Sequence, residues 1–192
     1  MTYQYDAFFS YRWHPRSDAW HRRVQEEIEY WVGLELGVDP RFFFDRKEMR
    51  PGQAVVGRLR DALLRSKCLV CFWSPRYFTS RWCLSEWKTF RMRGERVGTD
   101  LVLPASIHNA DAFPASAQAV VKQDFSDFHS IQDVFWNDPR RVLQFEELGI
   151  RPFAMALAEM IRKAPPFDSF EVANVDDDEI GPEPIIPWLA ND

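Results

Sequence analysis

The sequence predicts an α/β fold built on a doubly wound parallel sheet, and three observations support this prediction. Short apolar runs alternate along the chain with stretches in which apolar residues recur at helical spacing. Residues 68–73 are apolar throughout, which is typical of a parallel strand covered on both faces. Apolar residues make up 46% of the 192 residues, which is enough for the core of one domain. Strands and helices that alternate in this way are joined by right-handed crossovers.

The chain begins with a predicted strand and a long helix. Residues 3–11 form an aromatic-rich, nearly apolar strand. Ser17 or Asp18 can cap the helix that follows, because short polar side chains accept hydrogen bonds from the free amides of a first turn. Apolar residues continue at helical spacing to about residue 36, and Gly37 ends the helix.

A short strand, a polar loop and a second helix come next. Residues 41–45 predict a buried strand, and residues 46–53 a loop with Pro51 and Gly52 as its turn signal. The inner face of the second helix is marked by Val56, Leu59 and Leu63.

The middle of the chain predicts the centre of the sheet. Residues 67–73 are the central strand, and a third helix covers residues 80–93. The core face of this helix consists of Cys83, Trp87 and Phe90. Residues 101–107 are a fourth strand, in which Pro104 predicts the end of the strand or an edge position because proline cannot donate to a sheet ladder.

The last part of the chain predicts a strand, a helix and a tail. Residues 119–125 are a fifth strand, and Pro152 introduces the last helix. The apolar face of that helix includes Phe153, Leu157 and either Met160 or Ile161. We therefore divide the chain into a domain over residues 1–164 and an acidic, proline-rich tail over residues 165–192, which we expect to be poorly ordered or docked.

Composition and charge exclude several function classes. The net charge is −5, but all 24 basic residues precede the tail and eight of the 29 acidic residues lie in it, so residues 1–164 carry only +3. That excess is too small for a nucleic-acid binder. The chain has no apolar run near the roughly 20 residues of a membrane span and no secretion signal at its start, so we expect a cytoplasmic protein.

The cysteines and histidines do not predict a metal site. Cys68 and Cys71 lie three apart in a predicted strand, so their side chains point to opposite faces and are better interpreted as buried free thiols. The four histidines show no spacing typical of metal ligands.

The stretch Trp82-Cys-Leu-Ser-Glu86 is the strongest candidate for chemistry. It places an indole and a carboxylate at i and i+4 on one helix face. The first turns of a helix that follows a parallel strand lie at the carboxyl edge of the sheet, where open α/β folds bind ligands. A carboxylate beside a stacking surface suits glycosidic chemistry on a nucleotide. Alternatively, Trp82 anchors the core and Glu86 pairs in solvent with Arg81 or Arg93.

Other polar residues are expected at the same edge. Ser10, Tyr11 and Arg12 leave the first strand there and could contact a phosphate or ribose, although Arg12 could also lie in water. Asp45 ends the second strand and could bind a ribose hydroxyl or anchor the loop that follows.

The loop after Asp45 is positively charged. Arg46, Lys47 and Arg50 are either a solvated turn or contacts to phosphate or to a second subunit. The chain has no GxGxxG motif after its first strand, so a dinucleotide cannot be bound by the Rossmann phosphate turn.

Three blocks of sequence, in order, resemble the Toll/interleukin-1 receptor (TIR) domain. They are Tyr5-Asp-Ala-Phe-Phe-Ser-Tyr11, Phe43-Phe-Asp-Arg46 with Arg50-Pro-Gly52, and Trp82-Cys-Leu-Ser-Glu86. The resemblance covers roughly residues 3–163 and is most similar to bacterial NAD+-cleaving TIR proteins of anti-phage defence, as in Thoeris-type systems. It implies a flavodoxin-like fold with a five-stranded parallel sheet.

The resemblance also implies an activity. Glu86 matches the glutamate with which catalytic TIR domains cleave NAD+ at the nicotinamide–ribose bond, giving nicotinamide and ADP-ribose, cyclic ADP-ribose or related isomers. NAD+ is then a substrate, and no cofactor is expected. The loop with Arg46, Lys47, Arg50, Pro51 and Gly52 corresponds to the BB loop, which takes part in assembly and gates the site.

The implied partners are other TIR domains and an effector that senses the nucleotide product. Two alternatives remain at this point. One is a TIR scaffold without enzymatic activity that acts only by TIR–TIR assembly. The other is nucleotide base exchange, in which Glu86 attacks the sugar covalently.

Overall fold

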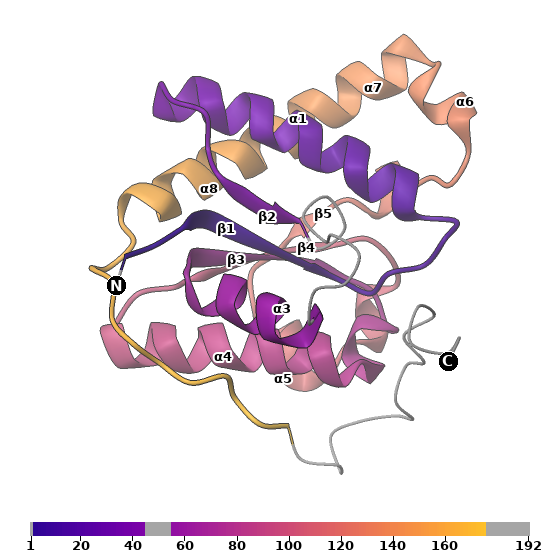
Figure 1. The fold of residues 1–192 in the computed structure, drawn as a ribbon. Coiled ribbons are helices and arrows are strands. Elements are labelled where there is room, and N and C mark those ends of the chain that lie inside the picture. The colour runs from indigo at the N-terminus through magenta and orange to yellow at the C-terminus, as the bar shows by residue number, and fades with distance from the viewer. Residues whose placement is uncertain (1, 45–54, 176–192) are drawn as a thin grey trace.

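The computed structural model describes residues 2–44 and 55–175 of the chain, and its fold is drawn in Figure 1. A five-stranded parallel sheet forms the centre, with the strand order β2-β1-β3-β4-β5. The strands are β1 (Tyr5–Tyr11), β2 (Phe42–Phe44), β3 (Ser66–Trp73), β4 (Val102–Ser106) and β5 (Gln123–Asp124). This is the 2-1-3-4-5 order of flavodoxin-like folds. The predicted fold class is confirmed.

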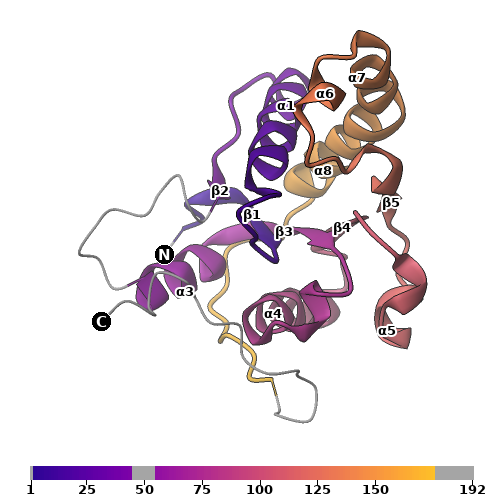
Figure 2. The same ribbon diagram turned by 90° about the vertical axis from the view of Figure 1, so that its right-hand side faces the viewer.

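Helices cover both faces of this sheet. They are α1 (Asp18–Leu36), α3 (Val55–Leu64), α4 (Arg81–Val97), α5 (Ala115–Gln118), α6 (Asp133–Trp136), α7 (Pro139–Phe145) and α8 (Arg151–Arg162). Short turns lie between them: η1 (Tyr77–Thr79), η2 (Ala110–Ala112), η3 (Ser126–Phe128) and the π-helical η4 (Glu146–Ile150). Figure 2 shows α1 and α8 on one side of the sheet and α3 and α4 on the other.

The core is divided by the sheet into two apolar clusters. Successive strand side chains point to opposite faces, so Phe9 packs in the cluster under α1 and α8, and Phe8 in the cluster under α3 and α4. Cys68 and Cys71 likewise lie in different clusters, and both are buried free thiols. The prediction that both are buried free thiols is confirmed.

The helix boundaries follow from local chemistry. α1 ends where Gly37 takes a positive φ of 73° and donates its amide to the Gly33 carbonyl, a conformation that costs glycine little. Ser80 caps α4, its hydroxyl accepting the amide of Cys83 at 3.5 Å. Because α4 starts there, directly after β3 and η1, its first two turns lie at the carboxyl edge of the sheet.

Two predictions about strands are wrong. Pro104 is neither at the end of β4 nor on an edge strand, since β4 lies between β3 and β5. The backbone groups of Leu101 and Ile107 form hydrogen bonds with β3. Successive residues of a strand direct their backbone groups to alternate sides, so the backbone of residue 104, three positions from each, is directed toward β5. β5 pairs only with Ala105 and Ser106, so no partner amide bond is lost at Pro104.

The fifth strand is also shorter than expected. Residues 119–125 were expected to be extended, but β5 contains only Gln123 and Asp124. Residues 115–118 form α5, and Val121 remains 94% exposed. Val120 and Val121 precede this strand, so the apolar pair does not mark an extended segment here.

After α8 the chain changes sides. Residues 164–175 leave the end of α8 and run as an extended segment along α4, on the opposite face of the sheet (Figures 1 and 2). We call this segment the strap. Among the described residues, no helix is both long enough and apolar enough to cross a membrane.

Candidate functional site

The site is built around a hydrogen bond between β1 and α4. The hydroxyl of Ser10 donates to Oε2 of Glu86 at 2.6 Å. Ser10 is buried, with 1% of its surface exposed, and Glu86 is half-buried. A hydroxyl–carboxylate bond of this length is charge-assisted and strong, so it orients the carboxylate of Glu86 toward one face of the helix.

Tyr77, in η1, extends this network into the core. Its hydroxyl lies 2.8 Å from Oγ of Ser10, to which it donates because the proton of Ser10 goes to Glu86, and 3.0 Å from the carbonyl oxygen of Cys83. Burial, followed by the charges around it, raises the pKa of Tyr77 well above its ordinary value. Tyr77 is therefore a neutral donor that holds Ser10 in place rather than an acid or base.

The neighbouring thiols are equally neutral. Burial, with a further contribution from the negative charge of Glu86, raises the pKa of Cys83 to about 12. Burial also raises the pKa of Cys71, to which Tyr77 lies within 3.3 Å. A thiol with such a pKa is not a nucleophile at neutral pH, which leaves the carboxylate of Glu86 as the candidate group for chemistry in this network.

Glu86 opens onto a cavity of about 560 Å³. Its walls come from α3, from the first two turns of α4 and from the end of the strap. The lining residues are Leu59, Arg60, Leu63, Arg81, Trp82, Ser85, Glu86, Glu171, Val172, Ala173, Asn174 and Val175. The volume lies within the roughly 300–1,000 Å³ of small-molecule sites.

The structure brings Trp82 and Glu86 together on this cavity, as expected from their i, i+4 spacing. Trp82 is half-buried and lines the cavity. Two cations, Arg60 and Arg81, line the same space. Two carboxylates, those of Glu86 and Glu171, therefore share one cavity with an aromatic ring and two guanidinium groups.

The three candidates at the end of β1 have different environments. Ser10 contacts Glu86 directly. Tyr11 points to the opposite face of the sheet, where its ring stacks on His21 and Phe44, so we leave it out of the proposed site. Arg12 is half-buried near Cys83; burial lowers its pKa, and the neighbouring Arg76 lowers it further.

Several predicted residues lie outside the described part of the chain. These are Asp45, Arg46, Lys47, Arg50, Pro51 and Gly52. Their assignment to substrate binding and to the BB loop remains a prediction.

The sequence reasoning missed four contributions to the site. They are Tyr77, Arg60, Arg81 as a wall of the cavity, and residues 171–175. The position of Arg60 could have been predicted from the sequence, because it directly follows Leu59, which the helical spacing assigns to the inner face of its helix. The strap has no such signal, since it packs through backbone atoms and isolated side chains.

The described residues offer no metal site. No group of three or more His, Cys, Asp and Glu side chains in residues 2–44 and 55–175 could hold a metal ion.

A comparison with protein families identifies the fold's relatives. The TIR domain family model matches residues 7–135, which is most of the domain. The chain belongs to the TIR domain family. The residues of the first and third sequence blocks lie within or at the edge of this match, and so does the Ser10–Glu86 pair.

Solved structures also resemble this TIR domain. The TIR domains of the activated Roq1 resistosome recognising the pathogen effector XopQ are 20% identical, with a TM-score of 0.44 over 81% of this chain and 84% of that one. The TIR domain of the Toll-related receptor TRR-2 from Hydra magnipapillata is 17% identical, with a TM-score of 0.46 over 75% of this chain and 99% of that one. A search of curated protein sequences returns no match.

Proposed function

We propose that this TIR domain is an NAD+ glycohydrolase or ADP-ribosyl cyclase that breaks the bond between nicotinamide and ribose. The observation that supports this best is the half-buried carboxylate of Glu86, oriented by Ser10 and open to a cavity that it shares with Trp82. A TIR domain that served only as a scaffold would have no chemical need for this arrangement.

One carboxylate is sufficient for this chemistry. Nicotinamide leaves as a neutral molecule that takes the bonding electron pair with it, so little acid assistance is needed. The ribose develops positive charge in the transition state, and a fixed negative charge beside it lowers the barrier. Water then supplies the electron pair of the new bond and loses a proton to the solvent, which gives ADP-ribose. Alternatively, a ring nitrogen of the adenine supplies the electron pair, which gives a cyclic product.

The other cavity residues fit the remaining parts of NAD+. The indole of Trp82 offers a stacking surface for an aromatic base. Arg60 and Arg81 carry the positive charge that a diphosphate requires, and guanidinium groups bind phosphate oxygens in pairs. NAD+ is therefore a substrate in this proposal, and no bound cofactor takes part.

The resemblance to catalytic TIR domains also supports a proposal for the biological role of the activity. The product would act as a signal for a downstream effector, or NAD+ would be depleted, in a bacterial immune response against phage. Self-association of TIR domains would control the activity.

The test is to incubate the purified protein with NAD+ and to separate the products by chromatography with mass detection. We expect nicotinamide release by the wild type and none by Glu86→Gln. The mass of the second product distinguishes hydrolysis from cyclisation, and trapping of a glycosyl-enzyme adduct would favour base exchange through Glu86. If the wild type releases no nicotinamide even at high protein concentration and with a crowding agent, the result would instead favour the scaffold.

A further inference from the structure

The strap reaches the cavity through a defined series of contacts along α4. Ser85, Thr89 and Arg93 lie at i, i+4 and i+8, so they form one stripe on the helix surface. All three are buried, which is unusual for an arginine. The strap covers this stripe from residue 168 to residue 175 and ends beside Glu86.

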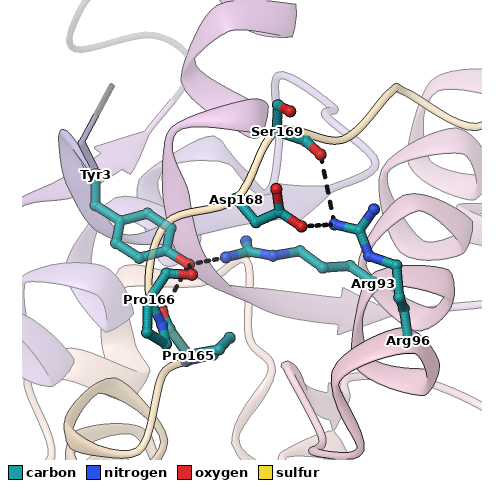
Figure 3. A network of polar contacts seen from close by, with 7 residues as sticks. All are labelled: Tyr3, Arg93, Arg96, Pro165, Pro166, Asp168 and Ser169. Carbon is teal, nitrogen blue, oxygen red and sulfur yellow. Dashed lines mark hydrogen bonds and ion pairs between the residues drawn. The ribbon is translucent and has the colours of Figure 1, made fainter.

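The first contacts hold the beginning of the strap (Figure 3). The hydroxyl of Tyr3 donates to the carbonyl of Pro165 at 3.0 Å, and it accepts a hydrogen bond from the guanidinium of Arg93. Arg96 forms an ion pair with Asp168 at 2.7 Å. That pair is exposed, so it contributes little.

The next contact is buried. The guanidinium of Arg93 lies 4.5 Å from the ring centre of Phe170 and donates to the carbonyl of Ser66 at 2.8 Å. Burial lowers the pKa of Arg93 to about 10, so the group remains charged at neutral pH. A charged guanidinium over an aromatic face is a favourable cation–π contact, and it ties the strap to both α4 and the sheet.

The last contact fixes the residues that line the cavity. The hydroxyl of Ser85 donates to the carbonyl of Ala173 at 2.7 Å, and the amide of Ala173 donates to Oγ1 of Thr89 at 2.9 Å. Thr89 can accept because its own proton goes to the carbonyl of Ser85. Both backbone groups of Ala173 are thus satisfied by α4, and Val175 is buried in the core, with 6% of its surface exposed.

We propose that residues 171–175 form a substrate-binding wall of the Glu86 cavity, with Asn174 as a specificity residue, and that Ser85 and Thr89 hold this wall in position. The inference rests on the proposed function, because it assigns the wall to NAD+. Asn174 lines the cavity and is exposed. Its carboxamide both donates and accepts hydrogen bonds, as the carboxamide of nicotinamide or the edge of adenine requires.

The kinetic test compares a variant in which the wall is detached from α4 with a variant in which only one side chain of the wall is changed. Ser85→Ala combined with Thr89→Val releases Ala173, and Asn174→Ala removes the polar side chain alone. We expect each to raise KM for NAD+ about tenfold with kcat changed less than about threefold, because the lost contacts bind substrate and transition state alike. Thr89→Ser keeps the hydroxyl and should retain the wild-type KM, and Thr99→Val is a matched threonine change beyond the end of α4.

A second measurement follows the mobility of the strap and does not depend on enzymatic turnover. Hydrogen exchange should show faster exchange of peptides in residues 164–175 in the Ser85→Ala, Thr89→Val variant than in the wild type. In Glu86→Gln, added NAD+ should slow exchange in residues 171–175.

The outcomes separate the two proposals. If the wild type releases nicotinamide but neither set of strap variants changes KM, the wall is overturned and the glycohydrolase stands. If truncation after residue 164 raises activity in a folded protein, the strap blocks the site and the inference is equally overturned. If the wild type is inactive, the proposed function fails, and exchange in residues 171–175 decides the wall: protection by NAD+ supports it and its absence overturns it.

Discussion

Two groups of buried and half-buried polar side chains lie around the end of β1, one on each face of the sheet, and they differ in what their polar atoms contact. On the α4 face, Ser10, Tyr77 and Glu86 are joined by hydrogen bonds and open to a cavity. On the α1 face, His21 stacks on Tyr11 with ring centres 4.3 Å apart and faces His129 at 6.2 Å. The first group is a connected network, and the second is a stack of rings.

The stacked group is held in a neutral state. Burial lowers the pKa of His21 to about 3, although its Nδ1 lies 2.8 Å from the carbonyl of Ser17. Burial also lowers the pKa of His129. Nε2 of both rings is buried without a hydrogen-bond partner among the described residues. These histidines therefore serve packing, whereas the network across the sheet places the carboxyl group of Glu86 beside a cavity.

The comparison shows that adjacency in sequence does not imply a shared role. Ser10 and Tyr11 are neighbours at the end of β1, yet alternation along the strand sends one to Glu86 and the other to His21. The following predictions test whether the two groups are as different as their contacts indicate.

The largest expected effect separates activity from stability at Glu86. Glu86→Gln should lower nicotinamide release by at least about 10³-fold, because it removes the charge that stabilises the transition state. The hydroxyl of Ser10 can still donate to the amide oxygen, so the free energy of unfolding should change by less than about 1 kcal/mol. Steady-state rates and urea denaturation measure the two effects.

Glu95→Gln is the matched control, since Glu95 lies on the same helix with 67% of its side chain exposed and pairs only weakly with Arg91 at 3.4 Å. It should retain the wild-type rate. A folded Glu86→Gln variant with normal turnover would remove Glu86 from the chemistry.

The second effect belongs to the stacked histidines and depends on pH. His21 stays neutral in the folded protein down to about pH 3, whereas an unfolded histidine gains a proton below about pH 6.5. The unfolded state therefore binds more protons between these values, and stability falls as pH falls. The slope is about 1.4 kcal/mol per pH unit.

The contribution of His21 is isolated by the ring-retaining change His21→Phe. Between pH 8 and pH 5 the wild type should lose about 2 kcal/mol more of its free energy of unfolding than the variant does. Urea titrations at the two pH values measure this difference. Parallel loss in both proteins would show that His21 is not held neutral.

The smallest effect tests whether Ser10 positions the carboxylate or only fills the core. Ser10→Ala should lower kcat about tenfold with KM nearly unchanged, and should cost about 1–2 kcal/mol of stability. Ser106→Ala is the matched comparison, because Ser106 is also buried, ends β4 in the same sheet and donates to a carboxylate, that of Asp124, at 3.0 Å.

The Ser106→Ala change should cost similar stability without lowering kcat. Equal losses of kcat in the two variants would mean that both serines act only through the packing of the sheet edge.

Much of the fold could be predicted because periodicity reports burial. Trp20, Val24 and Ile28 recur at helical spacing and are buried under the sheet, and residues 68–73 are apolar because helices cover both faces of β3. The ends of β4 and β5 could not be predicted in the same way. Pro104 and Val121 were interpreted from local chemistry, but the length of the neighbouring strand determines which backbone groups need partners.

The candidate site likewise has features that follow from local spacing in the sequence and features that depend on how distant segments pack. The i, i+4 spacing of Trp82 and Glu86 is a local property of a helix, so the sequence by itself placed both on one face at the carboxyl edge of the sheet. The contacts of Ser10 and Ala173 with α4 join residues 76 and 88 positions apart in the chain. No periodic pattern encodes such pairs, because a single hydroxyl or backbone amide finds its partner only after the strands and helices have packed. The tertiary structure alone therefore decided which residues orient the carboxylate and which segment encloses the cavity beside it.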